Sequence, residues 1–297
     1  MLEHRVLTLC KDGARLQLFK SLNCTHKLGH SCRSKPNWIV LSCSFLGLLA
    51  LIFEMFGWWQ TNEPQLFFNV GLLGLCYLYI IATILIASKI KDRVPLNFSR
   101  KFLHMMIGNF IFVIPFFTLT VFPLNFPFFV ASPFILVTFL FSPLSPVDLS
   151  GKIGGLSEIT GGGHKYGLVL YAVSYSVLAL LFSSKPYIIA AGILPMAYGD
   201  AAASLVGQKF GCHKYNISSP KSVEGSIAML ATCLSGLLVC LLFFSFFHPI
   251  SILSTALASL GTAIVATVCE ALTPRGFDNL TVPMFSAMVF LLLMGAH

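Results

Sequence analysis

The chain has 297 residues, of which 56% are hydrophobic and 10% are charged, and its mean hydropathy is +0.84. This composition excludes a soluble domain with a charged surface, so we expect an all-α, polytopic membrane helix bundle. The net charge of +8 is explained better by membrane topology and anionic lipid than by nucleic acid, which is not expected as a partner.

The first 36 residues form a basic tail, and residues 37–297 are expected to form a single transmembrane domain. The tail contains CTHKLGHSC, which brings two cysteines and two histidines close together. Their spacing does not match the usual zinc patterns, although a metal site there stays open. The alternatives are a solvated or disordered tail and an organelle-targeting segment.

Nine apolar segments have roughly the 17 to 25 residues that a helix needs to cross a bilayer. They cover residues 37–58, 65–88, 102–120, 123–142, 166–183, 186–207, 223–246, 249–270 and 279–295. Nine spans place 18 of the 19 lysines and arginines on one side, and Lys185 is the exception. Because Lys and Arg concentrate in cytoplasmic loops, this basic side is expected to face the cytosol or the equivalent organellar compartment.

The first polar island on that side is SRKFLHMMIGN, at the start of the third expected span. Arg100 and His104 are four residues apart and share one helical face, where both could reach an anionic group. Together with Lys101 they could equally be charges that extend to a membrane interface.

The second island is GKIGGLSEITGGGHKYGLVLY, with seven glycines between Gly151 and Gly167. It matches neither the common phosphate loop nor the dinucleotide pattern. It is therefore either a flexible linker or a segment whose backbone N–H groups approach phosphate. In the second case Glu158, His164 and Lys165 are candidate ligand contacts.

The third island, GDAAASLVGQKFGCHKYNISSPKSVEGSIAM, begins inside the sixth expected span. Asp200 and Ser204 are expected on one helical face, where small neighbours let another helix approach closely. An ionised Asp at the centre of a membrane helix costs about 2.5–3.5 kcal/mol on insertion scales. Asp200 is therefore expected to face the bundle interior or an aqueous cavity, with a partner.

The same island continues with three cations, Lys209, Lys214 and Lys221, and with SPKSVEG, which predicts the start of a helix. Ser219 or Ser222 could be its N-cap, with Pro220 in the first turn and Glu224 near the positive end of the helix dipole. Such a helix N-terminus beside Lys221 is a suitable anion site. Glu224 could also be only a capping residue.

The fourth island, CEALTPRGFDNLTVPM, places Glu270 at the end of one expected span and Asp278 and Asn279 at the start of the next. All three offer the oxygen ligands that Mg²⁺ prefers. Asp278 could also simply cap the ninth helix.

Together the islands offer glycines, cations and carboxylates on one face of an apolar bundle. Phosphoryl transfer needs such groups because its transition state spreads negative charge over phosphate oxygens. A bundle in lipid further suggests a hydrophobic acceptor.

From about Arg100 to Pro283, the motifs RKFLH, GHKYGLVLY, GDAAASLVGQKFG with KSVEGS, and CEAL with DNLTVP resemble the CTP-dependent lipid-alcohol kinases in content and order. This family includes phytol kinase, dolichol kinase and the yeast-type diacylglycerol kinase. The resemblance implies transfer of the γ-phosphate of CTP, with Mg²⁺, to an isoprenoid-like alcohol such as phytol, geranylgeraniol or dolichol. For a eukaryotic source, an endoplasmic reticulum or plastid membrane is expected.

The resemblance further implies roles for individual residues. The catalytic candidates are Asp200, Glu224 and Lys221. The candidates for binding nucleotide or phosphate are Arg100, Lys101, His104, Lys165, Lys209, Lys214, Ser222 and Gly225. The candidate metal ligands are Asp200, Glu224, Glu270, Asp278 and Asn279.

The acceptor stays open, because phytol kinase carries a second aspartate where this chain has Ser204. In that respect the chain is more similar to dolichol kinase, whereas its length is more similar to phytol kinase. Two other functions also remain: a cytidylyltransferase that makes a CDP-lipid, and an ion-coupled membrane transporter.

Overall fold

A computed structural model of the chain describes residues 38–90, 93–140, 167–274 and 276–295. The basic tail and the part of the glycine-rich island with Glu158, His164 and Lys165 lie outside these residues. Residues from Trp38 onward cluster into one unit, and the proposed division into a tail and a transmembrane domain stays a prediction.

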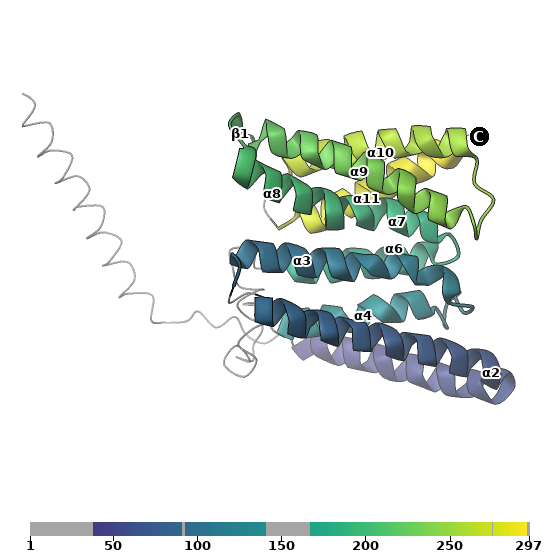
Figure 1. Ribbon diagram of the computed structural model, residues 1–297. Coiled ribbons are helices and arrows are strands. Elements are labelled where there is room, and N and C mark those ends of the chain that lie inside the picture. The colour runs from purple at the N-terminus through teal and green to yellow at the C-terminus, as the bar shows by residue number, and fades with distance from the viewer. Residues whose placement is uncertain (1–37, 91–92, 141–166, 275, 296–297) are drawn as a thin grey trace, which may run out of the picture. The chain divides into compact units, whose positions relative to one another are not determined.

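The described part is built almost wholly of helices that run side by side in stacked layers (Figure 1). The α-helices are α2 (Trp38–Ile90), α3 (Leu96–Gly108), α4 (Phe126–Leu140), α6 (Gly167–Phe182), α7 (Pro186–Leu194), α8 (Asp200–Phe210), α9 (Val223–Phe244), α10 (Ile252–Leu272) and α11 (Asp278–Gly295). Short helical turns are η1 (Asn109–Phe112) and η2 (Ile114–Phe116), which continue α3, and η3 (Pro195–Gly199), which joins α7 to α8.

One two-stranded antiparallel hairpin lies between α8 and α9. It consists of β1 (Lys214–Asn216) and β2 (Pro220–Ser222), and it pairs Lys214 with Ser222 and Tyr215 with Lys221. The expectation that Pro220 lies in the first turn of a helix is wrong, because Pro220 is the first residue of β2. The hairpin lies at the same end of the bundle as the end of α8 and the start of α9 (Figure 1).

Each of the nine expected spans overlaps a described helix, and the all-α membrane bundle is confirmed. The first two spans lie within one assigned helix, α2, and the third starts earlier than expected, at Leu96. In the described residues, five segments are long and apolar enough to cross a membrane. These are Pro64–Ile90, Pro186–Phe210, Val223–Phe244, Leu253–Leu272 and Asp278–Gly295. The number of crossings and their orientation stay predictions.

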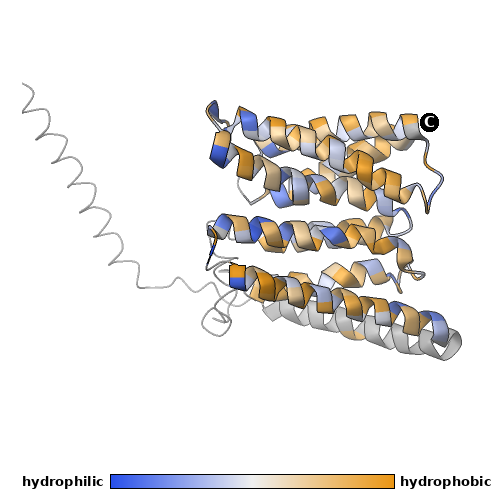
Figure 2. Ribbon diagram, in the orientation of Figure 1, coloured by the Kyte–Doolittle hydropathy of each residue, from blue (hydrophilic) through white to orange (hydrophobic). Residues whose placement is uncertain are grey.

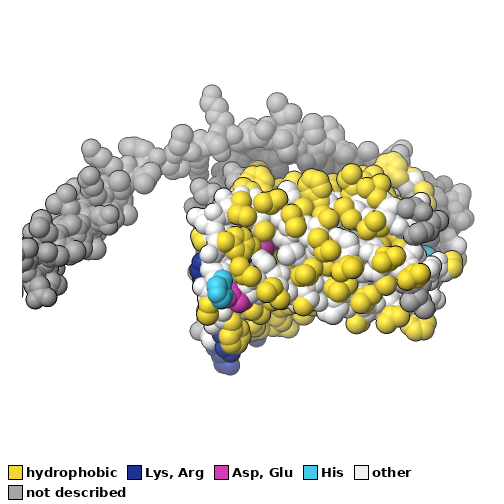
Figure 3. Space-filling model, turned by 90° about the horizontal axis from the view of Figure 1, so that it is seen from above, with side chains coloured by type: hydrophobic (Ala, Val, Ile, Leu, Met, Phe, Trp, Pro, Cys, Tyr) yellow, Lys and Arg dark blue, Asp and Glu magenta, His cyan; other side chains and the backbone are white. Residues whose placement is uncertain are grey.

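The outer surfaces of the bundle are apolar. Large side chains such as Leu78 on α2, Val239 on α9 and Leu253 on α10 are more than 60% exposed. Hydrophobic residues dominate most of the helix length (Figure 2), and in the face shown in Figure 3 charged side chains gather at one end. Because lipid chains are as apolar as leucine, this surface fits a bilayer and not water.

The segment Pro186–Phe210 lies at the centre of the bundle, since 78% of its most apolar window is buried, against 22–39% for the other four. It is one long helical path interrupted by the π-helical turn η3, in which the Asp200 N–H donates to the carbonyl of Pro195. Such π turns inside α-helices occur frequently at functional sites. The path brings Asp200 into the interior near the hairpin end.

The centre is held together by close helix approach at glycines. A Cβ at Gly192 of α7 would lie 2.6 Å from a methyl carbon of Leu178, 2.8 Å from the backbone oxygen of Pro283 and 3.2 Å from the Cβ of Ala287. We therefore expect Gly192→Ala to destabilise the protein by about 1–3 kcal/mol, because α6 and α11 must both move away from α7 to make room for the added methyl group. Thermal unfolding in detergent would measure this loss.

Gly74→Ala on α2 is the matched control, since nothing lies within 4 Å of its added Cβ. It should leave stability unchanged or raise it by up to about 1 kcal/mol through helix propensity. Equal unfolding temperatures for the two variants would contradict the packing described for α7.

Candidate functional site

Three of the four polar islands, the first, the third and the fourth, contribute residues to a cavity of about 320 Å³ at the hairpin end of the bundle. This volume lies at the lower end of the range for small-molecule sites. The lining residues come from α3, α8, the hairpin, α9, α10 and α11. They are Asn97, Arg100, Lys101, Asp200, Ala203, Ser204, Gly207, Gln208, Lys214, Pro220, Lys221, Ser222, Gly225, Ser226, Glu270 and Asp278.

Asp200 is the first residue of α8 and is 8% exposed. Its Oδ2 accepts a hydrogen bond from Nζ of Lys101, and the two side chains form a buried ion pair between α3 and α8. A charged carboxylate in this environment requires such a partner, so the expectation of an inward-facing, paired Asp200 agrees with the geometry.

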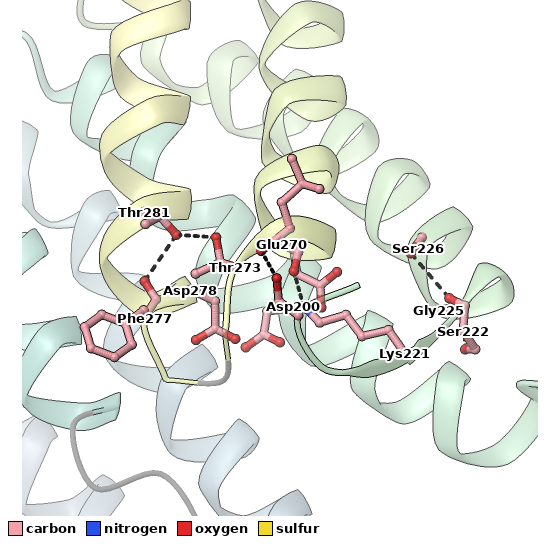
Figure 4. A network of polar contacts seen from close by, with 12 residues as sticks. Asp200, Lys221, Ser222, Gly225, Ser226, Glu270, Thr273, Phe277, Asp278 and Thr281 are labelled. Carbon is pink, nitrogen blue, oxygen red and sulfur yellow. Dashed lines mark hydrogen bonds and ion pairs between the residues drawn. The ribbon is translucent and has the colours of Figure 1, made fainter. Parts of the chain in front are cut away.

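A second ion pair closes the other side of the cavity. Lys221 of β2 approaches Oε1 of Glu270 at 2.5 Å and also donates to the backbone oxygen of Glu270. Both side chains are largely buried. Figure 4 shows Lys221 and Glu270 meeting next to Asp200, so the two ion pairs share one polar site.

Asp278 is the third carboxylate of the cavity. Its Oδ1 accepts from the backbone N–H of Gly276 at 3.1 Å and of Asn279 at 3.0 Å, so it caps the start of α11. Its side chain also lines the cavity and lies beside that of Asp200 in Figure 4. The capping and ligand-binding roles considered for Asp278 are therefore compatible.

The N-terminus of α9 faces the cavity. Ser222 is its N-cap, and the Ser222 hydroxyl accepts from the Gly225 N–H at 3.2 Å. A Cβ at Gly225 would lie 2.8 Å from the carbonyl oxygen of Ala203, so α8 and α9 could not approach this closely with larger residues. Backbone N–H groups at a helix start, with Lys221 beside them, favour an anion.

The opposite wall is a chain of neutral and basic side chains between α3 and α8. Asn97 donates to Ser204 at 2.9 Å and accepts from Arg100 at 2.9 Å, and Gln208 donates to Ser204 at 3.3 Å. Asn97 and Gln208 were not among the predicted site residues. Helical periodicity could have found them, because Asn97 is three positions before Arg100 and Gln208 is four after Ser204.

Most of the predicted residues line this one cavity: Arg100, Lys101, Asp200, Lys214, Lys221, Ser222, Gly225, Glu270 and Asp278. Four others do not line it. His104 is buried against the ring of Tyr171, and Lys209 lies over the ring of Phe210. Asn279 is buried and donates to the Gly167 carbonyl. Glu224 faces outward and accepts from His213, whose Nδ1 is 2.7 Å from Oε1 of Glu224.

The donor set suits Mg²⁺ only together with a ligand. Among the described residues, no group of three or more His, Cys, Asp or Glu is arranged to hold a metal ion. Mg²⁺, however, is commonly bound through one or two carboxylates and the phosphates of a substrate. Asp200 and Asp278 offer such oxygens in one cavity.

Comparison with curated proteins finds relatives with kinase names. The chain is 39% identical over 132 residues to a phytol kinase from Synechocystis, and the matched region covers 43% of this chain and 54% of that protein. It is 32% identical over 136 residues to a probable chloroplastic phytol kinase from Triticum aestivum, covering 43% of this chain and 44% of the relative. It is 27% identical over 142 residues to the CTP-dependent diacylglycerol kinase 1 of Saccharomyces cerevisiae, covering 42% and 48%.

The chain is related to the CTP-dependent lipid-alcohol kinases. This confirms the resemblance drawn from the sequence motifs. The chain spans about half the length of the curated relatives it matches. No protein-family model matches the chain, and no solved structure matches it. The cavity at the hairpin end is the candidate active site.

The Lys221–Glu270 pair is open to a direct energetic test. Lys221→Met or Glu270→Gln alone leaves a largely buried charge without its partner, which should cost about 3–5 kcal/mol of stability. The double variant should cost clearly less than the two single losses added together, because it leaves neither charge. Unfolding of all four proteins in detergent measures the coupling. Additive losses would show that the two side chains are not paired.

Proposed function

We propose that the protein is a CTP-dependent kinase that transfers the γ-phosphate of CTP to the hydroxyl of a membrane isoprenoid alcohol. The observation that carries the proposal is the cavity itself, where carboxylates and cations from distant segments meet at the end of an apolar bundle. The printed names of the relatives support the same reaction. We further propose a plastid membrane, which the chloroplastic relatives support, with the endoplasmic reticulum as the alternative.

The triphosphate is proposed to bind between the two sides of the cavity. Four cations line it, Arg100, Lys101, Lys214 and Lys221, against three carboxylates. The N-terminus of α9, with Ser222 and Gly225, would contact phosphate oxygens through backbone N–H groups. Lys101 and Lys221 would share their charge between phosphate and their carboxylate partners. This arrangement offers positive charge to oxygens that become more negative during transfer.

Mg²⁺ is proposed to be held by Asp278 and Asp200 together with phosphate oxygens. When bound, it would neutralise charge on the phosphates. Asn279, Glu224 and Lys209 lie outside the cavity lining, so we place them outside the proposed reaction centre.

The acceptor hydroxyl is proposed to reach the γ-phosphate from the apolar part of the bundle. Its oxygen forms a bond to the γ-phosphorus, the bond between that phosphorus and the β–γ bridging oxygen breaks, and CDP leaves. The hydroxyl proton passes to a carboxylate oxygen, for which Asp200 is the candidate, since it lines the cavity and belongs to the most buried apolar segment of the bundle. Such general-base help is typically worth about 10²–10⁴ in rate.

The position of a radiolabel separates this reaction from CDP-lipid synthesis. With purified protein, Mg²⁺ and phytol, geranylgeraniol, dolichol or diacylglycerol, or with the monophosphate of each of these lipids as the acceptor that CDP-lipid synthesis requires, label from the γ-phosphate of CTP should enter one or more of the alcohols. Label from the α-phosphate should remain in CDP. Incorporation of the α-label would identify a cytidylyltransferase, and no incorporation by folded protein would contradict both reactions.

Single-residue variants test whether the cavity carries the activity. Asp200→Asn and Lys221→Met should each lower kcat/KM for CTP about 100-fold or more, since each removes a charge that contacts the reacting groups. Lys185→Met is the matched control, because Lys185 is exposed and precedes α7 outside the cavity. Wild-type rates for Asp200→Asn in a folded protein would place the active site elsewhere.

A further inference from the structure

Glu224 is the predicted catalytic residue that the proposed reaction leaves without a role. It is the second residue of α9, and its side chain is 25% exposed. Its Oε1 and Oε2 accept from the backbone N–H of His213 at 3.0 and 3.3 Å, and Nδ1 of His213 is 2.7 Å from Oε1. His213 is 82% exposed, and a solvent-exposed ion pair contributes little to overall stability. The contact is therefore expected to act on local geometry and not on the stability of the whole bundle.

The contact joins the chain that leaves α8 to the start of α9. The His213 carbonyl accepts from the Val223 N–H at 3.0 Å, so both backbone groups of His213 are bonded to the first two residues of α9. The next residue, Lys214, is the first of β1 and pairs with Ser222 of β2. Because the contact lies directly beside this first pair of the hairpin, it fixes where both strands stand relative to α9.

The two hairpin lysines depend on this placement. Nζ of Lys214 donates to the Gly207 carbonyl at 3.0 Å, in the last turn of α8. A Cβ at Gly211 would lie 2.7 Å from that nitrogen and also 2.7 Å from the Ser222 Oγ, so the ammonium group lies beside the N-cap of α9. Lys221, on the other strand, lines the same cavity. The hairpin therefore presents two cations next to the helix N-terminus at which phosphate is proposed to bind.

We propose that Glu224 is a positioning residue, which holds the hairpin so that Lys214 and Lys221 contact the phosphates of CTP. This role rests on the proposed function, in which both lysines bind the triphosphate. Glu224 does not line the cavity, and it acts through the backbone of His213. A carboxylate suits this task because it has two acceptor oxygens, and its charge strengthens the hydrogen bonds that it accepts.

Glu224→Met tests the role by removing both acceptor oxygens at nearly unchanged side-chain length. It should raise the KM for CTP about fivefold to tenfold, the loss expected for one hydrogen bond, and leave kcat and the KM for the lipid alcohol unchanged. Glu224→Gln keeps a carbonyl oxygen for the His213 N–H, so its KM for CTP should stay within about twofold of wild type. A metal ligand or general base would instead lose about 100-fold in kcat in both variants, and that result would overturn the positioning role.

Two further variants control for indirect effects. His213→Ala keeps the backbone N–H, so the KM for CTP should change by no more than about twofold. Gly192→Ala disturbs the packing of α7 away from the cavity lining, so it should lower the unfolding temperature without changing either KM. An equal rise of both KM values in Glu224→Met, or the same rise in Gly192→Ala, would indicate a general loss of structure and overturn the positioning role.

Hydrogen–deuterium exchange without CTP separates failure of this inference from failure of the proposed function. In Glu224→Met the amides from His213 to Ser222 should exchange faster than in wild type, because the hairpin opens more often, whereas in Glu224→Gln they should not. Unchanged exchange in Glu224→Met, with kinase activity in the wild type, would overturn the role of Glu224. Faster exchange, with a wild type that phosphorylates no alcohol, would support Glu224 as the residue that holds the hairpin and overturn the kinase function.

Discussion

The ion pair between Asp200 and Lys101 is the constraint on which the rest of the site depends. A carboxylate at the centre of a membrane bundle is costly unless an opposite charge and hydrogen bonds compensate for it. Lys101 supplies that charge from a segment 99 residues away, which places α3 beside α8. The Lys221–Glu270 pair applies the same rule to the hairpin and α10. Two compensated carboxylates therefore assemble a cavity from four segments.

The same pairs explain how the cavity could serve a charged substrate. Each lysine is held in place by a carboxylate, so the two ammonium groups are already positioned in the cavity wall before a ligand binds. A phosphate that approaches can take a share of that positive charge, while the freed carboxylate oxygens become available to a metal ion or a proton. The close approach of α8 and α9 at Gly207 and Gly225 adds backbone N–H groups to the same wall. Preorganised charge of this kind is the main means of stabilising phosphoryl transfer.

Sequence periodicity predicted much of this arrangement. Asp200 and Ser204 share a helical face, as their four-residue spacing indicated, and Ser222 caps α9 as one of two predicted candidates. Spacing alone could not determine which of the neighbours Arg100 and Lys101 pairs with Asp200, since that depends on the rotation of α3 about its axis. It also did not predict the hairpin, because strands of three residues carry too little pattern, and Pro220 suggested a helix start. Glu224 faces outward since the hairpin brings His213 to it.

A structure of the protein in nanodiscs with Mg²⁺ and a non-hydrolysable CTP analogue would test the central claim most directly. We predict density for the triphosphate in the cavity between Lys101 and Lys221, with the terminal phosphate beside Asp200. A nucleotide bound at another position, with both ion pairs undisturbed, would contradict the account.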